Sequence, residues 1–310
     1  MPVELAIIIV NWNGGELLRR CLESVAQCPP SLPHEIVVVD NASTDGSREW
    51  LESLGERVRL IKNDENAGFG RANNQGFAAT DAPLLFLLNN DAEVRAGAID
   101  KLIETINSEQ RIGMCGPRLI NPDGSLQISV WRNPVTGWEL LVTSFGLARL
   151  LPKRIRGELL LADYWAHNRR RRVNMLIGAA ILVKREIVDA VGGFDERFHM
   201  YGEDNEWCLR TVRAGWWLMF EPDATVMHHG GQSARKRWTS AEELQTRLDS
   251  YLNFQRHCLP WRRALTVELS LCFLLSCKRV YRKLQGVVAD DLKLAWQVHT
   301  KELKRLLWQS

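Results

Sequence analysis

Strand signals and helix signals alternate along the first third of the chain, and this order limits the fold more than any other feature. Each strand signal is a short run rich in Val, Ile and Leu, and each helix signal spaces its apolar residues at the helical period. We expect strands at Leu5–Val10, Glu35–Val39, Val58–Ile61 and Leu84–Leu88. We expect helices at Glu16–Ala26, Ser47–Leu54, Arg71–Ala79 and Ala98–Ser108. The alternation predicts an α/β fold with a mostly parallel central sheet flanked by helices.

The rest of the chain divides into further α/β elements and a helical end. Residues 118–172 show no regular period, whereas Met175–Val183 and Trp216–Glu221 indicate two more strands. Helical spacing then continues to the end of the chain. We therefore expect an α/β domain over residues 1–238 and a C-terminal helical extension over residues 239–310.

The composition excludes several classes of protein. With a formal net charge of +3, the chain gives no electrostatic indication of a nucleic-acid partner. Its seven cysteines include no Cys-x-x-Cys pair, so we expect neither a zinc site nor a disulfide framework. The apolar run Leu5–Val10 is too short for a signal sequence or a membrane span. We predict a protein of the reducing cytoplasm.

Polar residues follow three of the predicted strands. These segments are Asn11-Trp12-Asn13, Asp40-Asn41 and Asn89-Asn90-Asp91. Each alone is an ordinary turn or cap sequence. Together they fall at the carboxyl ends of strands, where open α/β sheets bind nucleotides.

A glycine-rich turn, Asn66-Ala67-Gly68-Phe69-Gly70-Arg71, precedes the third predicted helix. It is a poor match to the dinucleotide fingerprint, because Asn73 replaces the third glycine and the turn follows the third strand. A glycine turn at a helix start can still approach a phosphate, with Arg71 supplying positive charge.

Four acidic residues lie close together in Gly192–Phe198 and Gly202-Glu203-Asp204. A carboxylate at a glycine-marked helix start is either a helix cap or a base at the mouth of a pocket. Asp91 and the distant His228 are of the ligand types that suit a divalent cation, although a turn and plain surface are the simpler explanations for each.

These motifs, in this order, resemble family 2 glycosyltransferases with the GT-A (nucleotide-diphospho-sugar transferase) fold, and their rhamnosyltransferase-like branch in particular. The resemblance covers roughly residues 3–235. It is carried by Val10–Gly14, Val39–Ser47, Asn66–Gly76, Leu88–Asp91, Gly192–Phe198, Gly202–Asp204 and His228–Ser233.

The resemblance implies a role for each matching position. Asp204 matches the catalytic base, Asp91 and His228 match the metal ligands, and His229 is the less favoured register. The donor nucleotide would be bound by Asn11, Trp12, Asn13, Asp40, Asn66, Gly68, Arg71 and Asn90. Asn89 stands where the family's metal motif begins with Asp, so the expected Mn²⁺ or Mg²⁺ site has one negative charge fewer.

Three further residues have a structural explanation beside a functional one. Asp195 and Glu203 are expected to contact the donor sugar or the acceptor, or else to form ion pairs within the fold. Trp207 is expected to line the pocket or to pack in the core.

The resemblance implies an inverting transferase that moves rhamnose or another hexose from a dTDP- or UDP-linked donor to a growing, lipid-linked glycan. A sugar nucleotidyltransferase shares such a sheet, but it needs a basic glycine loop after the first strand, and Asn11–Gly15 lacks a basic residue. The third hypothesis is a non-catalytic glycan-binding scaffold. Asn89 favours it, because this residue replaces the first Asp of the metal motif.

The C-terminal region places the apolar run Leu265–Cys277 directly before the basic run Lys278–Lys283. Glu268 interrupts the apolar run, which is too short to span a bilayer. Basic residues beside an amphipathic helix predict peripheral binding to an anionic membrane on its cytoplasmic face. A helical hairpin at a homodimer contact is the alternative.

Overall fold

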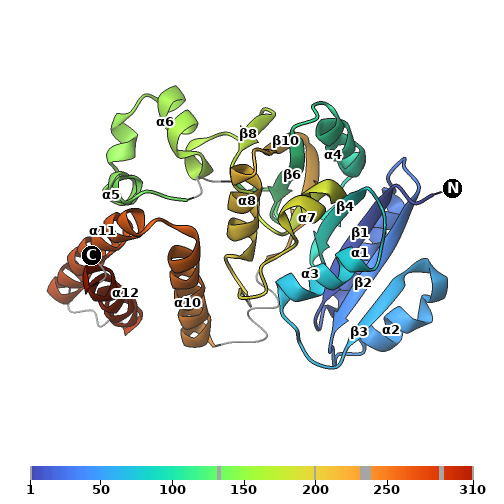
Figure 1. The fold of residues 1–310 in the computed structure, drawn as a ribbon, viewed down its shortest axis with the longest axis horizontal. Coiled ribbons are helices and arrows are strands. Elements are labelled where there is room, and N and C mark those ends of the chain that lie inside the picture. Colours follow the sequence, from blue (N-terminus) through green and yellow to red (C-terminus); the bar gives the residue numbers. More distant parts are fainter. Residues whose placement is uncertain (1, 131–133, 199, 231–238, 286–289, 309–310) are drawn as a thin grey trace. The chain divides into compact units, whose positions relative to one another are not determined.

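The computed structural model divides into two compact units (Figure 1). It describes residues 2–130, 134–198, 200–230, 239–285 and 290–308. Unit 1 comprises Met1–Trp131 and Ala166–Arg237, and unit 2 comprises Arg132–Trp165 and Trp238–Ser310.

Unit 1 is built on one sheet with the strand order β3-β2-β1-β4-β9-β6-β10-β5. The strands are β1 (Leu5–Asn11), β2 (His34–Asn41), β3 (Arg59–Asn63), β4 (Leu84–Asn89), β5 (Ala92–Val94), β6 (Ile112–Ile120), β7 (Leu126–Gln127), β8 (Arg171–Val173), β9 (Ala180–Lys184) and β10 (Trp217–His228). Strands β1 to β4 pair in parallel, as the alternation predicts. Beyond β4 the sheet is mixed, because β9 runs antiparallel to both β4 and β6.

Helices cover this sheet. They are α1 (Gly15–Gln27), α2 (Ser47–Ser53), α3 (Phe69–Ala78), α4 (Ala98–Asn107), α7 (Arg185–Val191) and α8 (Glu203–Arg213), with a short 3₁₀ turn η1 (Gly55–Arg57). The side chains of β1 and β4 are buried almost throughout. Helix α3 packs closely on β1, because Gly76 presents no side chain: a Cβ there would lie 2.5 Å from Ile8 Cγ2.

Two predicted strands have different bounds in the structure. Met175–Ala179 is a buried apolar loop, so β9 begins only at Ala180. Apolar composition alone does not separate a buried loop from a strand. The strand predicted at Trp216–Glu221 instead extends to His228, which brings that histidine into the sheet.

Unit 2 is helical. Its elements are α5 (Gly137–Ser144), η2 (Leu147–Leu150), α6 (Lys153–Leu160), η3 (Ala162–Tyr164), α10 (Ser240–Cys258), α11 (Trp261–Leu284) and α12 (Asp290–Trp308). Helix α5 packs against α11 at Gly137, where a Cβ would lie 2.5 Å from the carbonyl oxygen of Thr266. Residues 132–165 therefore group with the C-terminal helices. The sequence pattern instead places them in the α/β domain of residues 1–238. Within the described ranges, no helix has the length and apolar character needed to cross a bilayer.

Candidate active site

Asn11 ends β1 and Asp40 is the last residue but one of the neighbouring β2, and both side chains are fully buried. The Asn11 amide nitrogen donates to Asp40 Oδ1 and to Ser47 Oγ, each at 2.9 Å. The Asn11 oxygen accepts from the backbone nitrogen of Gly14 at 3.2 Å. Because its polar atoms are satisfied inside the protein, Asn11 fixes the loops that follow the two strands.

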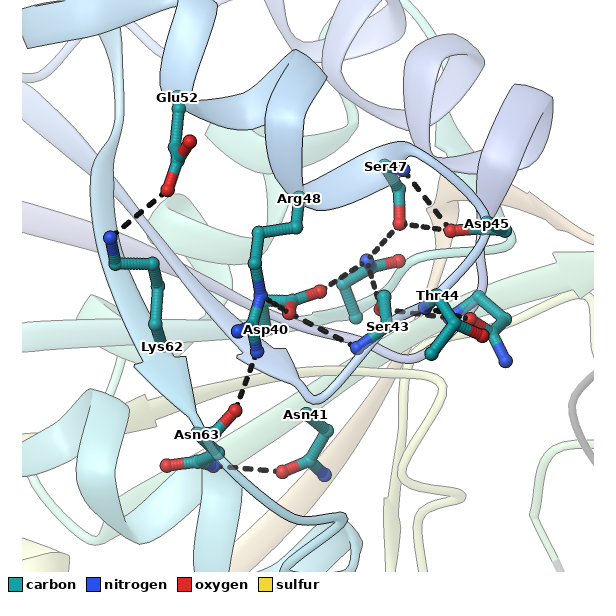
Figure 2. A network of polar contacts seen from close by, with 12 residues as sticks. Asp40, Asn41, Ser43, Thr44, Asp45, Ser47, Arg48, Glu52, Lys62 and Asn63 are labelled. Carbon is teal, nitrogen blue, oxygen red and sulfur yellow. Dashed lines mark hydrogen bonds and ion pairs between the residues drawn. The ribbon is translucent and has the colours of Figure 1, made fainter.

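Asp40 forms an ion pair that no sequence motif predicts (Figure 2). Arg48 of α2 donates from Nε to Asp40 Oδ2 at 2.7 Å and from Nη2 to the carbonyl oxygen of Asn63 at 2.5 Å. A buried carboxylate needs such a partner, because an unpaired charge in the interior is strongly destabilising. A cation in the first turn of a helix opposes the helix dipole, and this is the signal in the sequence that could have identified Arg48.

The half-buried residues Trp12, Asn13 and Asn66 lie on the loops around this network. Asn13 has a positive φ of 50°, and its backbone nitrogen donates to Ser43 Oγ at 3.0 Å. Its side-chain oxygen accepts from the backbone nitrogen of Thr44 at 2.8 Å. The loops after β1 and β2 are thereby held together as one rim.

The loop before α3 is attached to the same rim through Asn41. Its amide nitrogen donates to the carbonyl oxygen of Gly68 at 3.2 Å, and Asn66 Oδ1 accepts from the Gly68 nitrogen at 3.0 Å. Gly68 has φ 84°, a conformation that glycine adopts without strain. Arg71 is exposed, and its Nε lies 3.9 Å from Glu196 Oε2, so its guanidinium is not part of this network.

Asp91 and His228 are buried side by side beyond the end of β4. His228 Nε2 lies 3.2 Å from Asp91 Oδ1 and 3.3 Å from Asn89 Nδ2. Asn90 donates from Nδ2 to Asn11 Oδ1 at 3.0 Å. The turn that carries Asp91 is thus tied directly to the network at the ends of β1 and β2.

Gln127 of β7 orients the His228 ring, and no sequence pattern marks it. His228 Nδ1 lies 2.7 Å from Gln127 Oε1. An amide oxygen only accepts hydrogen bonds, so Nδ1 carries a proton, and in the neutral ring the lone pair is on Nε2, which faces Asp91. Asn121 holds Gln127 in turn, accepting from its amide nitrogen at 2.9 Å.

The donors at this position fit a divalent cation. A carboxylate oxygen and an imidazole lone pair converge, and both are ligand types of Mn²⁺. In the part of the chain that the structure describes, no cluster contains three His, Cys, Asp or Glu residues placed to hold a metal. A cation here would therefore take two donors, Asp91 and His228, and complete its shell with substrate oxygens and water. Gly231–Ser233, which extend the His228 motif, lie outside the described residues.

Asp204 lies in the first turn of α8 and is joined to this site through two residues. Its Oδ2 accepts from the backbone nitrogen of Gly178 at 3.1 Å. The neighbouring carbonyl of Ala179 accepts from the backbone nitrogen of Asn89 at 2.9 Å. The Gly178–Ala179 turn therefore links the Asp204 carboxylate to the Asp91 turn. Gly178 lies within the run predicted as a strand, which is why sequence reasoning missed it.

Glu203, which is buried, and Asp204, which is half-buried, carry adjacent carboxyl groups. Burial, with the nearby Asp204 charge, raises the pKa of Glu203 to about 8. Burial also raises the pKa of Asp204, while hydrogen bonds from Gly178 and Asn205 partly offset this effect. Glu203 Oε2 is buried and has no hydrogen-bond partner in the structure described. One carboxyl group of the pair is therefore neutral near pH 7, and it retains unused hydrogen-bonding capacity.

Asp195 and Trp207 have structural partners. Arg197 donates to Asp195 from Nε at 2.9 Å, and this hydrogen bond lowers the pKa of Asp195. Trp207 is fully buried, donates from Nε1 to the carbonyl of Gly192 at 2.9 Å, and packs its ring 4.5 Å from that of Phe194. Trp207 is thus a core residue, and the sequence-based alternative of a sugar contact does not agree with its burial.

Solved structures of sugar transferases share this fold. The chain aligns over 98% of its length with 57% of GalNAc-T7 solved with UDP, GalNAc and Mn²⁺, at a TM-score of 0.60 and 17% identity. It aligns over 97% of its length with 85% of the mannosyltransferase PcManGT from Pyrobaculum calidifontis in complex with GDP-Man and Mn²⁺, at a TM-score of 0.51 and 14% identity. The architecture is the GT-A fold of glycosyltransferases.

The chain belongs to glycosyl transferase family 2, whose model matches residues 6–190. It is 29% identical to N-acetylglucosaminyl-diphospho-decaprenol L-rhamnosyltransferase of Mycobacterium tuberculosis, over 84% of this chain and 87% of that protein. It is 28% identical to the low-salt glycan biosynthesis hexosyltransferase Agl10 of Haloferax volcanii, over 68% of this chain and 62% of that protein. The protein is a glycosyltransferase, and its resemblance to the rhamnosyltransferase-like branch is confirmed.

Proposed function

We propose that this glycosyltransferase inverts the anomeric carbon of its donor sugar, with Asp204 as the base. The observation that carries the proposal is the Gly178–Ala179 turn, which bonds to the Asp204 carboxylate on one side and to the Asp91 turn on the other. In a single displacement, the acceptor oxygen attacks one face of the sugar while the diphosphate leaves from the opposite face. The Gly178–Ala179 turn is bonded both to the proposed base and to the proposed site of the leaving group, which suits attack and departure on opposite faces of the sugar.

The rim residues Trp12, Asn13 and Asn66, with the Gly68 backbone, are proposed to contact the donor nucleotide. Asn11, Asp40 and Asn90 then act by holding those loops, since their polar groups already bond within the protein. Arg71 is proposed to reach the diphosphate from the exposed side of α3, leaving its long ion pair with Glu196.

Asp91 Oδ1 and His228 Nε2 are proposed to hold Mn²⁺ or Mg²⁺ with the diphosphate of the donor. When bound, such a cation offsets negative charge on the leaving nucleoside diphosphate. Gln127 keeps the His228 lone pair available for this contact. The proton of the acceptor hydroxyl passes to Asp204, and the new glycosidic bond forms as the bond to the diphosphate breaks.

Glu203 is proposed to bind the acceptor beside the base. Its buried Oε2 offers a hydrogen bond that no described residue takes up. Because its pKa is raised to about 8, Glu203 is neutral near pH 7 and does not set a second negative charge against Asp204. A hydroxyl of the acceptor sugar has the donor and acceptor character to bond to this oxygen, provided that the first turn of α8 moves to expose it on binding.

The donor is proposed to be a dTDP- or UDP-linked hexose such as rhamnose, and the acceptor a lipid-linked saccharide. The Mycobacterium tuberculosis relative is named for rhamnosyl transfer and for a diphospho-decaprenol-linked saccharide. That relative and this chain align over most of their lengths. An acceptor of this kind would place the enzyme at the cytoplasmic face of a membrane.

A donor panel tests the proposal. Purified protein is incubated with dTDP-rhamnose, UDP-hexoses and GDP-mannose, with Mn²⁺, Mg²⁺ or EDTA, and with a short-chain polyprenyl diphosphate saccharide. We expect metal-dependent release of nucleoside diphosphate with one donor class, and a product of inverted anomeric configuration by NMR. A product with retained configuration, or equal rates with EDTA, would contradict the mechanism.

A further inference from the structure

Unit 2 carries nearly all of the large apolar side chains that are exposed among the described residues. In the described ranges, every large apolar side chain that is exposed, apart from Val3, belongs to this unit. Soluble proteins rarely gather exposed apolar side chains in this way unless the surface binds something. Since these residues lie outside the proposed active site, they require a separate explanation.

Six of these side chains define what we call the docking face. They are Trp138 and Phe145 of the α5 segment, and Leu269, Phe273, Val280 and Leu284 of α11. Their exposed fractions run from 48% at Leu269 to 82% at Leu284. The four α11 residues recur at the helical spacing, so they form one stripe along the helix.

The α5 segment joins this stripe directly. The rings of Phe145 and Phe273 lie 6.1 Å apart between their centroids. At Gly137 the two helix backbones approach so closely that a Cβ would lie 2.7 Å from Ser270 Oγ. Trp138 follows Gly137 and is 55% exposed. The docking face is therefore a single surface built from two distant parts of the sequence.

The charges of helix α11, which carries most of the docking face, are almost all positive. Helix α11 carries six basic residues, Arg262, Arg263, Lys278, Arg279, Arg282 and Lys283, and one acidic residue, Glu268. Glu268 is fully buried, with Oε2 2.9 Å from His299 Nδ1 of α12. No negative charge of α11 therefore reaches its surface.

We propose that the docking face binds the surface of an anionic lipid bilayer. The aromatic and aliphatic side chains would enter the boundary between head groups and acyl chains, and the cations would meet lipid phosphates. Trp138 suits such a boundary, since its ring is apolar and its indole N–H is polar. A second copy of the chain fits less well, because a symmetric contact would bring the α11 cations of the two copies together.

Vesicle sedimentation of the full chain, without donor or acceptor, tests the apolar part. We compare vesicles of phosphatidylcholine alone with vesicles that also contain phosphatidylglycerol. We expect binding to the anionic vesicles and at least roughly tenfold weaker binding by Phe145→Ser/Phe273→Ser. Val3→Ser, an exposed apolar site of unit 1, should bind as the wild type does. Circular dichroism checks that each variant is folded.

The electrostatic part is tested in parallel. Arg282→Gln/Lys283→Gln should weaken binding on the order of thirtyfold, because each cation near an anionic surface contributes about 1 kcal/mol. Arg57→Gln/Lys101→Gln, which removes the same charge from unit 1, should bind like wild type.

Three results would overturn the proposal. One is a wild-type protein that does not sediment with anionic vesicles at low salt. Another is full binding by Phe145→Ser/Phe273→Ser. The third is a wild-type dimer that this variant converts to monomer while vesicle binding persists. None of them bears on sugar transfer, which is measured with a short-chain acceptor in solution.

Discussion

Replacing Glu203 by Gln should stabilise the protein at alkaline pH and leave its stability unchanged in acid. The carboxyl is buried, and Oε2 has no hydrogen-bond partner among the residues the structure describes. Its pKa rises from 4.5 to about 8 on folding. Between these values the folded state holds a proton that the unfolded state has released, so stability falls as the pH rises through this window.

The size of the effect follows from the shift. At about 1.4 kcal/mol per pKa unit, the rise to about 8 amounts to roughly 5 kcal/mol of lost stability above the window. This is an upper limit, because water that reaches the ionised group relieves part of the penalty. Gln keeps the shape of the side chain and carries no charge. For a domain of this size, even half of that figure would raise Tm by roughly 5–10 °C.

Thermal unfolding followed by circular dichroism at about pH 5, 7 and 9 measures this difference. We expect the Tm of Glu203→Gln to match wild type near pH 5 and to exceed it increasingly toward pH 9. Glu186→Gln, at an exposed glutamate of α7, controls for the loss of one acidic residue. If the wild type is the more stable protein at pH 9, the Glu203 carboxylate is stabilised in the fold and the reasoning fails.

Two further predictions concern residues that position the site. Gln127→Ala should weaken Mn²⁺ affinity about 10- to 100-fold, because His228 loses the partner that fixes its ring. Calorimetric titration with Mn²⁺ and UDP measures this affinity. An unchanged affinity would show that Gln127 does not support the metal site. Asn11→Ala should lower the free energy of unfolding by roughly 3 kcal/mol in urea, because it leaves several buried groups without partners. Asn107→Ala, at an exposed asparagine, should change the free energy of unfolding little. Equal effects of the two substitutions would contradict the claim that Asn11 holds the loops after β1 and β2 in place.

Much of unit 1 follows from the sequence because β1 to β4 are buried runs that alternate with amphipathic helices. The antiparallel insertion of β9 does not follow, because strand direction depends on how the chain returns to the sheet. The α5 segment was missed although Thr136 and Glu139 form a capping box, since no regular apolar period follows it. Its packing on α11 is a contact between distant segments that local patterns do not encode.

The site shows the same division. Asp91, His228 and Asp204 are proposed as site residues because they stand in motifs whose order is specific. Gln127 could not be predicted, since it acts through a contact with His228, about a hundred residues further along the chain. Arg48 stands in no motif, and only its position in the first turn of α2 marks it. The motif residues therefore carry the proposed chemistry, and the structure adds the residues that hold them in place.

Asp204→Asn tests the central claim most directly, through transfer rate and donor affinity measured on the same preparation. Asn keeps the size of the side chain and cannot take the proton of the acceptor hydroxyl. We expect transfer to fall at least about a thousandfold, toward the upper range for loss of a general base, while calorimetry shows donor affinity within a few-fold of wild type. The control Asp189→Asn, on α7, should keep the transfer rate and the donor affinity of the wild type. Transfer by Asp204→Asn at the wild-type rate would contradict the assignment of Asp204 as the base.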